Sequence, residues 1–229
     1  MGFILLAALV IAIVAGPTIW VRRTLHKYAQ PENRYDVTGA ELARELLGLE
    51  GMEGVDVEPA EGAIGDHYDP TTRTVRLSAG HYDGRSLAAV TVAAHEVGHA
   101  VQHAQSYQPL TLRTRLVGAL DASQKLGAAM LFATPLVAAI TRSPAPTLLT
   151  VFGGLLIMGS SIVVHLLTLP TEFDASFRRA LPLLKKHALL HEVDVPHAQR
   201  ILLAAACTYV AAALISLFNV ARWWAVLRR

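Results

Sequence analysis

The sequence predicts a mainly α-helical integral membrane protein with about four transmembrane helices and a small α+β domain. Hydrophobic residues make up 53% of the 229 residues and charged residues only 17%, which is more apolar than the usual composition of a soluble domain. Several apolar runs approach the length of about 20 residues that crosses a bilayer. Polar segments with helical or strand periodicity lie between them. Lipid is therefore the expected solvent of part of the chain.

The first apolar run, residues 3–20, contains no charged residue and predicts a transmembrane anchor over residues 1–21. A cleaved signal peptide normally begins with basic residues. No basic residue precedes this run, and Arg22 and Arg23 follow it. We therefore expect the segment to be retained as an anchor.

Residues 22–115 have the composition of a soluble part that carries the chemistry. Thr38 and Glu41 form a capping box, which predicts the start of a short amphipathic helix. Ser86 is a preferred residue for capping a second, longer helix, whose apolar positions recur at helical spacing. That longer helix contains the motif described below.

Two segments of this part alternate apolar and polar residues as strands do, at residues 55–57 and 73–78. Between them, residues 69–71 form a turn signal. Residues 75–78 are either an edge strand, to which an extended peptide could add by backbone hydrogen bonds, or an ordinary strand within the sheet. The pattern of residues leaves both alternatives open.

The second half of the chain is mostly apolar. Residues 116–169 predict a transmembrane hairpin, which is broken by a proline-rich stretch at residues 142–147. Residues 170–200 form a polar segment that we expect to rejoin the soluble part. Residues 201–229 predict a C-terminal transmembrane helix with a basic tail.

The basic residues that flank the spans predict the orientation, because cytosolic loops carry an excess of Lys and Arg. They are more numerous on the side of the soluble part, and the basic C-terminus is the exception. We expect a multi-pass protein of the cell (inner) membrane whose soluble part faces the cytosol. The basic residues on that side are Arg22, Arg23, Lys27, Arg113, Arg115, Arg178, Arg179, Lys185 and Lys186.

The charge distribution argues against nucleic acid as a partner. The net charge is only +2, and the basic residues lie beside apolar runs, not in a block that could follow phosphates. The single cysteine, Cys207, lies in an apolar run and cannot form an intramolecular disulfide. The expected partners are therefore the bilayer and the substrates of the site.

Residues 95–99 read His-Glu-Val-Gly-His within the longer predicted helix. This spacing puts the imidazoles of His95 and His99 on one helix face, where both can bind one zinc ion. Glu96 lies beside the same site, where its carboxylate can take a proton from a zinc-bound water. We expect a zinc site with Glu96 as the catalytic base. The alternative is a chance or purely structural occurrence of the pattern.

A catalytic zinc usually has a third protein ligand and one position open for water. His103 lies four residues after His99, close to the face of the motif. Glu172 begins a polar segment and could complete a His-His-Glu site from a second helix. Spacing alone leaves both residues open. The third histidine of the metzincin pattern is excluded, because Gln105 occupies its position.

Four segments carry a resemblance to a known family, at residues 66–70 (DHYDP), 75–78 (VRLS), 91–103 (TVAAHEVGHAVQH) and 172–176 (EFDAS). They resemble the YugP-type neutral zinc metallopeptidases of bacterial membranes, which are related to the HtpX-like and CAAX prenyl protease groups. The similarity extends over most of the chain. It implies a zincin-like catalytic domain of the gluzincin kind, a Zn²⁺ cofactor, and peptide hydrolysis by a metal-activated water.

The resemblance also implies the third zinc ligand. In that family the ligand is the Glu of a Glu-Phe-x-Ala segment, which is Glu172 in this chain. In the wider group of gluzincins, an Asp four residues later supports a zinc-bound His. This chain has Ser176 at that position, so we expect a weaker supporting hydrogen bond. Asp174 is expected to point away from the face of Glu172.

His67 is a candidate for stabilising the oxyanion of the tetrahedral intermediate, because peptide hydrolysis needs a donor besides the metal. The alternative is a histidine in the turn before residues 69–70. The expected function is a membrane-embedded zinc endopeptidase acting on peptides or membrane proteins. The alternative function is a zinc-binding membrane scaffold or chaperone partner without peptidase turnover. Nothing in the sequence indicates an oligomeric state.

Overall fold

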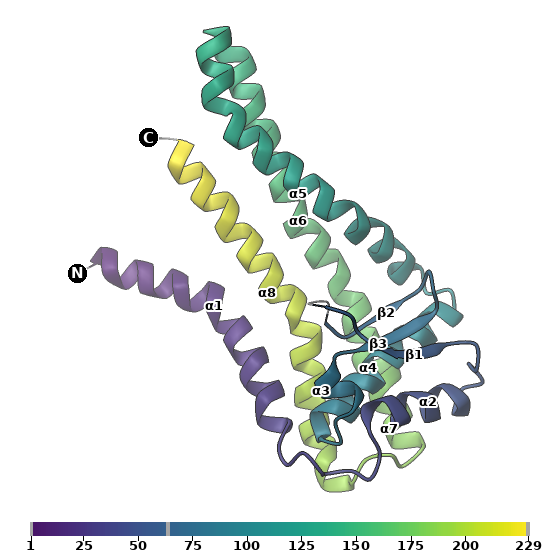
Figure 1. Ribbon diagram of the computed structural model, residues 1–229. Helices are drawn as coiled ribbons and strands as arrows, with labels where there is room; N and C mark the ends of the chain where they lie inside the picture. The colour runs from purple at the N-terminus through teal and green to yellow at the C-terminus, as the bar shows by residue number, and fades with distance from the viewer. Residues whose placement is uncertain (1, 63–64, 228–229) are drawn as a thin grey trace. The chain divides into compact units, whose positions relative to one another are not determined.

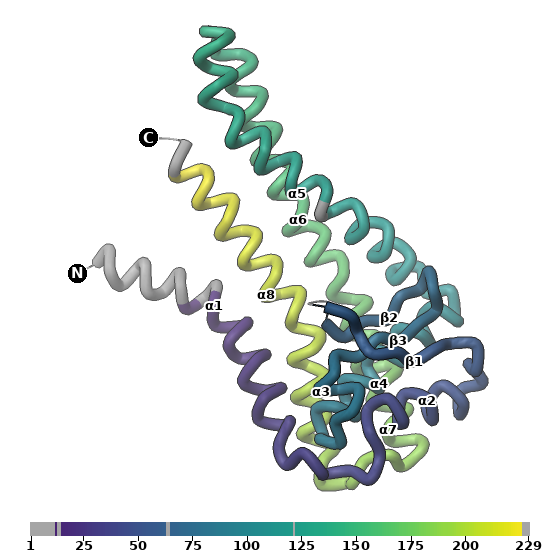
Figure 2. Tube along the Cα trace, in the orientation of Figure 1, coloured from purple at the N-terminus to yellow at the C-terminus, as the bar shows by residue number. Residues whose placement is uncertain are grey.

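The structure is a computed structural model that describes residues 2–62 and 65–227, without the side chains of residues 2–11, 13–14, 121 and 226–227. The chain forms two compact units. Figure 2 shows the path of the chain through both. The helical unit comprises Met1–Pro17, Leu112–Leu169 and Tyr209–Arg229, and the mixed unit comprises Thr18–Thr111 and Pro170–Thr208.

The protein is mainly helical, as the composition predicts. Its long helices are α1 (Gly2–Tyr28), α5 (Gln108–Thr141), α6 (Pro144–Phe173) and α8 (Val195–Leu227). Among the described residues, three helical segments are long and apolar enough to cross a membrane, at Gln108–Thr141, Pro144–Lys186 and Glu192–Ala225.

The predicted N-terminal span, residues 3–20, lies on α1, and most of its side chains fall outside the described part. The expected fourth transmembrane helix therefore stays a prediction. The predicted hairpin corresponds to α5 and α6, which run side by side (Figure 1).

Glycines allow α5 and α6 to approach each other closely within the helical unit. A Cβ atom added at Gly127 would lie 3.0 Å from the carbonyl oxygen of Gly154. A Cβ atom at Gly154 would lie 2.8 Å from the side chain of Leu131. Small residues at such crossings are typical of helix pairs in membranes, where close packing drives association. A larger residue at Gly127 or Gly154 would therefore push α5 and α6 apart.

The mixed unit contains a three-stranded sheet of β1 (Asp56–Pro59), β2 (His67–Asp69) and β3 (Thr74–Leu77) in the order β1-β3-β2. β1 runs parallel to β3, and β2 runs antiparallel to it. The edge-strand alternative for residues 75–78 is therefore wrong, because β3 is the middle strand. The edges are β1 and β2. β2 was not predicted from the sequence, because a strand of three residues with one buried side chain, Tyr68, is too short to establish a periodicity.

Helices cover the sheet in the mixed unit. α2 (Gly39–Leu49) begins with the predicted capping box of Thr38 and Glu41, and α4 (Leu87–Ala104) is capped by the predicted Ser86. α4 packs against α2 and against the sheet, so it is buried on every side from Leu87 to Gln102. The remaining elements are α3 (Ala79–Tyr82), the π-helix η1 (Asp174–Ala180), α7 (Leu181–Lys186) and the 3₁₀-helix η2 (Glu192–Asp194).

Candidate metal centre

α4 carries the two histidines of the motif at the centre of the mixed unit. His95 and His99 are 4% and 2% exposed. Their rings lie edge to face with centroids 4.8 Å apart, as two side chains one turn apart on the same helix face should. Both imidazoles therefore face the same neighbour.

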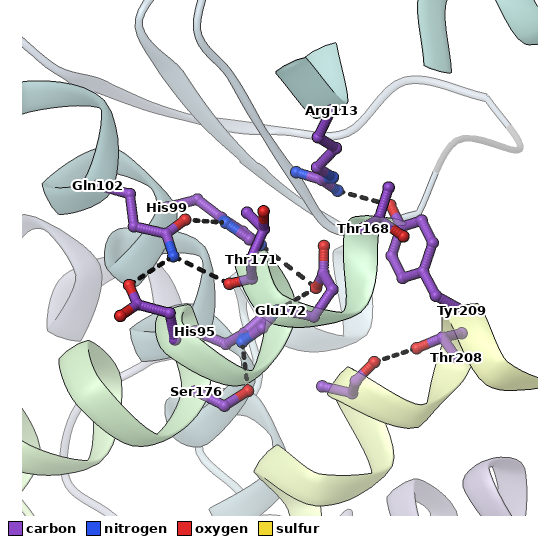
Figure 3. A network of polar contacts seen from close by, with 12 residues as sticks. His95, His99, Gln102, Arg113, Thr168, Thr171, Glu172, Ser176, Thr208 and Tyr209 are labelled. Atoms are coloured by element: carbon purple, nitrogen blue, oxygen red, sulfur yellow. Dashed lines mark hydrogen bonds and ion pairs between the residues drawn. The ribbon is translucent and has the colours of Figure 1, made fainter. Parts of the chain in front are cut away.

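That neighbour is Glu172, in the last turn of α6. Its Oε2 atom lies 3.3 Å from Nε2 of His95 and 3.4 Å from Nε2 of His99. Figure 3 shows the three side chains converging from the two helices. One ligand atom from each residue lies within 4.8 Å of the other two. The structure thus brings together two histidines and a glutamate that are far apart in the sequence.

This arrangement fits a zinc ion. Ligand atoms bonded at about 2.0–2.1 Å to a tetrahedral zinc lie roughly 3.3 Å from one another, and the two measured separations between Glu172 and the histidines are 3.3 and 3.4 Å. Imidazole nitrogen and carboxylate oxygen are ordinary zinc ligands, and three protein ligands leave one position open. His95, His99 and Glu172 could therefore hold a zinc ion with little rearrangement.

A glycine allows the two helices to meet at this point. A Cβ atom at Gly98 would lie 2.6 Å from the carbonyl oxygen of Ala175, in η1. Gly98 therefore packs closely against the backbone of η1. A π-helical turn begins at Asp174, two residues after Glu172. Such turns are rare and are found frequently at functional sites.

Ser176 supports His95. The Ser176 hydroxyl lies 3.1 Å from Nδ1 of His95 and donates to the carbonyl oxygen of Leu202 at 3.2 Å. Because the hydroxyl has one hydrogen, which Leu202 accepts, its lone pair is available to Nδ1–H of His95. His95 then presents an unprotonated Nε2 towards Glu172.

Gln102 supports His99, and the sequence analysis did not identify it. Its Oε1 lies 3.0 Å from Nδ1 of His99, and its Nε2 donates to the carbonyl oxygen of Thr171 at 2.9 Å (Figure 3). The same Nε2 also donates to Asp174 at 2.8 Å. The spacing of three residues between His99 and Gln102 on a helix was a signal that could have indicated this contact. Gln102 is fully buried.

The other candidates for the third ligand lie elsewhere. Nδ1 of His103 is 2.8 Å from the hydroxyl of Tyr68 on β2, and His103 does not belong to the metal-binding group. Asp174 also lies outside that group. Its carboxylate instead accepts a hydrogen bond from Gln102.

Glu96, the expected base, is only 6% exposed on α4, and it is not a member of the ligand group. His67 lies on the edge strand β2, where its Nδ1 is 2.8 Å from the carbonyl oxygen of Gly65. His67 is thus a strand residue and not a turn residue. Its role as an oxyanion donor stays a prediction.

A second polar cluster holds the end of β3 to the neighbouring loop. Asp66 accepts hydrogen bonds from the backbone N–H and the hydroxyl of Ser78, and its second oxygen lies 2.8 Å from Nδ1 of His81. Burial raises the pKa of Asp66, but the interactions with His81 and Ser78 outweigh it and leave the pKa below its ordinary value. Asp66 is therefore ionised at neutral pH.

The structure thus combines a buried His-His-Glu group that could hold a metal ion with helices long and apolar enough to cross a membrane. Residues 3–228 match the family described as "Putative neutral zinc metallopeptidase", and this chain belongs to that family. The protein described as "Putative membrane protease YugP" from Bacillus subtilis (strain 168) is 37% identical over 213 residues, which cover 91% of this chain and 90% of the relative. No solved structure matches the chain.

Proposed function

We propose that this protein is a membrane-embedded, zinc-dependent endopeptidase in which His95, His99 and Glu172 hold the zinc ion. The observation that carries the proposal is the position of Glu172 Oε2, 3.3–3.4 Å from Nε2 of both histidines. When bound, zinc supplies Lewis acidity that activates water and polarises the carbonyl of the substrate. Membership of a zinc metallopeptidase family supports this assignment.

Glu96 is the general base in this proposal. It takes a proton from the attacking water and later donates that proton to the leaving amine. Its place within the His-Glu-x-x-His pattern on α4 supports this role, because the glutamate of that pattern serves as the general base of zinc metalloproteases. The low exposure of Glu96, 6%, keeps the carboxylate away from bulk water. His67 is assigned to the oxyanion, for which the edge position of β2 offers access.

The same proposal includes the membrane arrangement. Four transmembrane helices, with α1 as the N-terminal anchor, carry a zincin-like catalytic domain of the gluzincin kind on the cytosolic side. The three apolar helical segments and the description of the Bacillus subtilis relative as a membrane protease support membrane embedding. The substrates are peptides or membrane proteins that reach the site because it lies close to the bilayer.

Comparing the parent with Glu96→Gln tests the function. Both proteins are purified in detergent, their zinc content is measured, and hydrolysis of casein is followed. We expect one zinc per chain in both, with loss of hydrolysis only in Glu96→Gln, since the amide cannot accept the proton. Glu45→Gln, which changes an exposed glutamate on α2, is the matched control and should behave as the parent.

Two outcomes would contradict the proposal. Equal activity in Glu96→Gln and the parent would remove Glu96 as the base. Stoichiometric zinc without hydrolysis by the parent, on casein and on membrane-protein substrates, would instead favour a zinc-binding scaffold or chaperone partner.

A further inference from the structure

The side-chain amide of Gln102 has only one orientation that its surroundings accept. Its Nε2 faces two acceptors, the carbonyl oxygen of Thr171 at 2.9 Å and the carboxylate of Asp174 at 2.8 Å. A flipped amide would place Oε1 against both oxygens and leave buried acceptors facing one another, at a substantial cost in free energy. Both amide hydrogens are therefore used, and Oε1 must face His99.

This orientation decides which nitrogen of His99 carries the proton. Oε1 of Gln102 can only accept, and it lies 3.0 Å from Nδ1 of His99. Nδ1 must therefore carry the hydrogen, and Nε2 keeps its lone pair in the neutral ring. Nε2 is the atom that lies 3.4 Å from Glu172 Oε2, on the side of the proposed ion. The hydrogen bond thus prepares His99 to bind metal through the correct nitrogen.

Asp174 is in turn held in place by Arg179. Nε of Arg179 donates to its Oδ2 at 3.1 Å, and the guanidinium also bonds to Gln105 and lies over the ring of Tyr107, 6.0 Å from its centroid. Asp174 is 6% exposed, so the ion pair is largely shielded from water. The same Oδ2 atom of Asp174 thus accepts hydrogen bonds from both Gln102 and Arg179.

From these contacts we propose that Gln102 is a positioning residue that fixes the tautomer of His99 for zinc binding, and that the Arg179–Asp174 ion pair locks the amide of Gln102. The proposal rests on the proposed zinc site. It adds to that site a chain of three supporting side chains, Gln102, Asp174 and Arg179. Its physical basis is that a metal-ligating histidine whose other N–H has a fixed acceptor binds more tightly, typically by 10–100-fold.

The test uses the full-length protein in detergent and two readouts that do not depend on hydrolysis. Zinc affinity is measured by competition with a chromophoric chelator. The Nδ1–H proton of His99 is followed by NMR of the zinc-loaded, ¹⁵N-histidine-labelled protein. Gln102→Leu should bind zinc about 10–100-fold more weakly, and the Nδ1–H signal should exchange rapidly with water. Gln108→Leu, an exposed glutamine at the start of α5, should match the parent in both readouts.

Two further variants distinguish a role of Gln102 in orienting His99 from a role in filling space. Gln102→Glu alone keeps an acceptor for His99 but places its second oxygen against the carboxylate of Asp174 and the carbonyl oxygen of Thr171. The double variant Gln102→Glu/Asp174→Asn removes the repulsion at position 174 and leaves the one at Thr171. We expect weak zinc binding in the single variant and a partial recovery of zinc affinity and of the Nδ1–H signal in the double variant. Thermal unfolding of the zinc-free proteins controls for loss of the fold.

The results that would overturn the role of Gln102 differ from the results that would overturn the proposed peptidase function. Parental zinc affinity and a protected Nδ1–H signal in a folded Gln102→Leu protein would overturn the positioning role. Zinc bound by the parent without peptide hydrolysis would overturn the proposed enzyme but leave the affinity comparison decisive for Gln102. A parent that binds no stoichiometric zinc would overturn both proposals.

Discussion

At the scale of single residues, the two histidines of the candidate site are supported by different groups. His95 meets the hydroxyl of Ser176 and His99 meets the amide of Gln102. Neither acceptor is charged, so each polarises its histidine less than a carboxylate would. Both side chains are fully buried, which strengthens these hydrogen bonds relative to exposed ones.

Removal of the Ser176 hydroxyl should weaken zinc binding. In Ser176→Ala, Nδ1–H of His95 and the carbonyl oxygen of Leu202 both lose their partner, so we expect roughly tenfold lower zinc affinity, at the lower end of such effects. Chelator competition measures the change. Ser160→Ala, which removes an exposed hydroxyl bonded only to its own helix, is the control. Unchanged affinity in Ser176→Ala would show that His95 needs no such support.

The lowered pKa of Asp66 predicts how the stability of the fold depends on pH. Because its folded pKa lies below the ordinary value, its contribution is fully present above the pKa of the unfolded chain and is lost as the pH falls through the folded pKa. Asp66→Asn should therefore lower the free energy of unfolding at pH 7 by about 1–3 kcal/mol, with a smaller difference from the parent at the acid end. Unfolding in urea, with chelator present throughout, measures both.

The control for this prediction is Asp83→Asn, an exposed residue at the end of α3. It should follow the parent at every pH. A constant difference between Asp66→Asn and the parent from pH 7 down to pH 2 would contradict the assignment of the effect to ionisation of Asp66.

The sequence predicts part of the site at this scale. The ligands on α4 follow from helical periodicity, because residues four apart must share a face. Glu172 and Ser176 required a resemblance, since no local rule connects them to a helix about 75 residues earlier. The hydrogen bond between Gln102 and Asp174 was not predicted, because a contact between side chains on two helices depends on how those helices cross.

At the scale of elements, the contact between α4 and η1 decides whether the ligands meet. The backbone of Ala175 lies where a side chain at Gly98 would have to be. A methyl group there must push the two elements apart, and interiors packed at crystal-like density do not absorb such a shift. The separation of Glu172 from the histidines therefore depends on a single glycine.

Gly98→Ala should destabilise the protein and impair zinc binding together. We expect a loss of about 1–3 kcal/mol in the free energy of unfolding, as in other overpacked interiors, and weaker zinc affinity in the fraction that folds. Gly48→Ala, in α2 with open space around the glycine, is the control. It should be neutral or slightly stabilising, because alanine favours helix. Parental stability and zinc affinity in Gly98→Ala would contradict this account.

Element prediction succeeded where a local signal exists. The capping box at Thr38 and the cap at Ser86 each satisfy backbone N–H groups of a helix start within a few residues. β2 was missed and β3 was not recognised as central, because the order of strands in a sheet depends on pairing between distant segments. Periodicity identifies a strand but not its neighbours.

At the scale of the whole molecule, the positive-inside bias makes orientation testable. Cys207 is the only cysteine, so Cys207→Ala provides a background for single reporters. With the mixed unit in the cytosol, Glu53→Cys should react with a membrane-impermeant maleimide only after lysis, whereas Ala145→Cys, near the tip of the hairpin, should react in intact cells in which that side is accessible. Both native residues are exposed. The reverse labelling pattern would show that the basic C-terminus sets the orientation.

The order of the ligands along the chain has a consequence for biosynthesis. His95 and His99 are made before the apolar helices α5 and α6, and Glu172 is made after nearly all of both. A nascent chain that ends before Glu172 offers a metal ion two ligands instead of three. The complete ligand set of the proposed zinc site therefore becomes available only after the ribosome has passed both long helices.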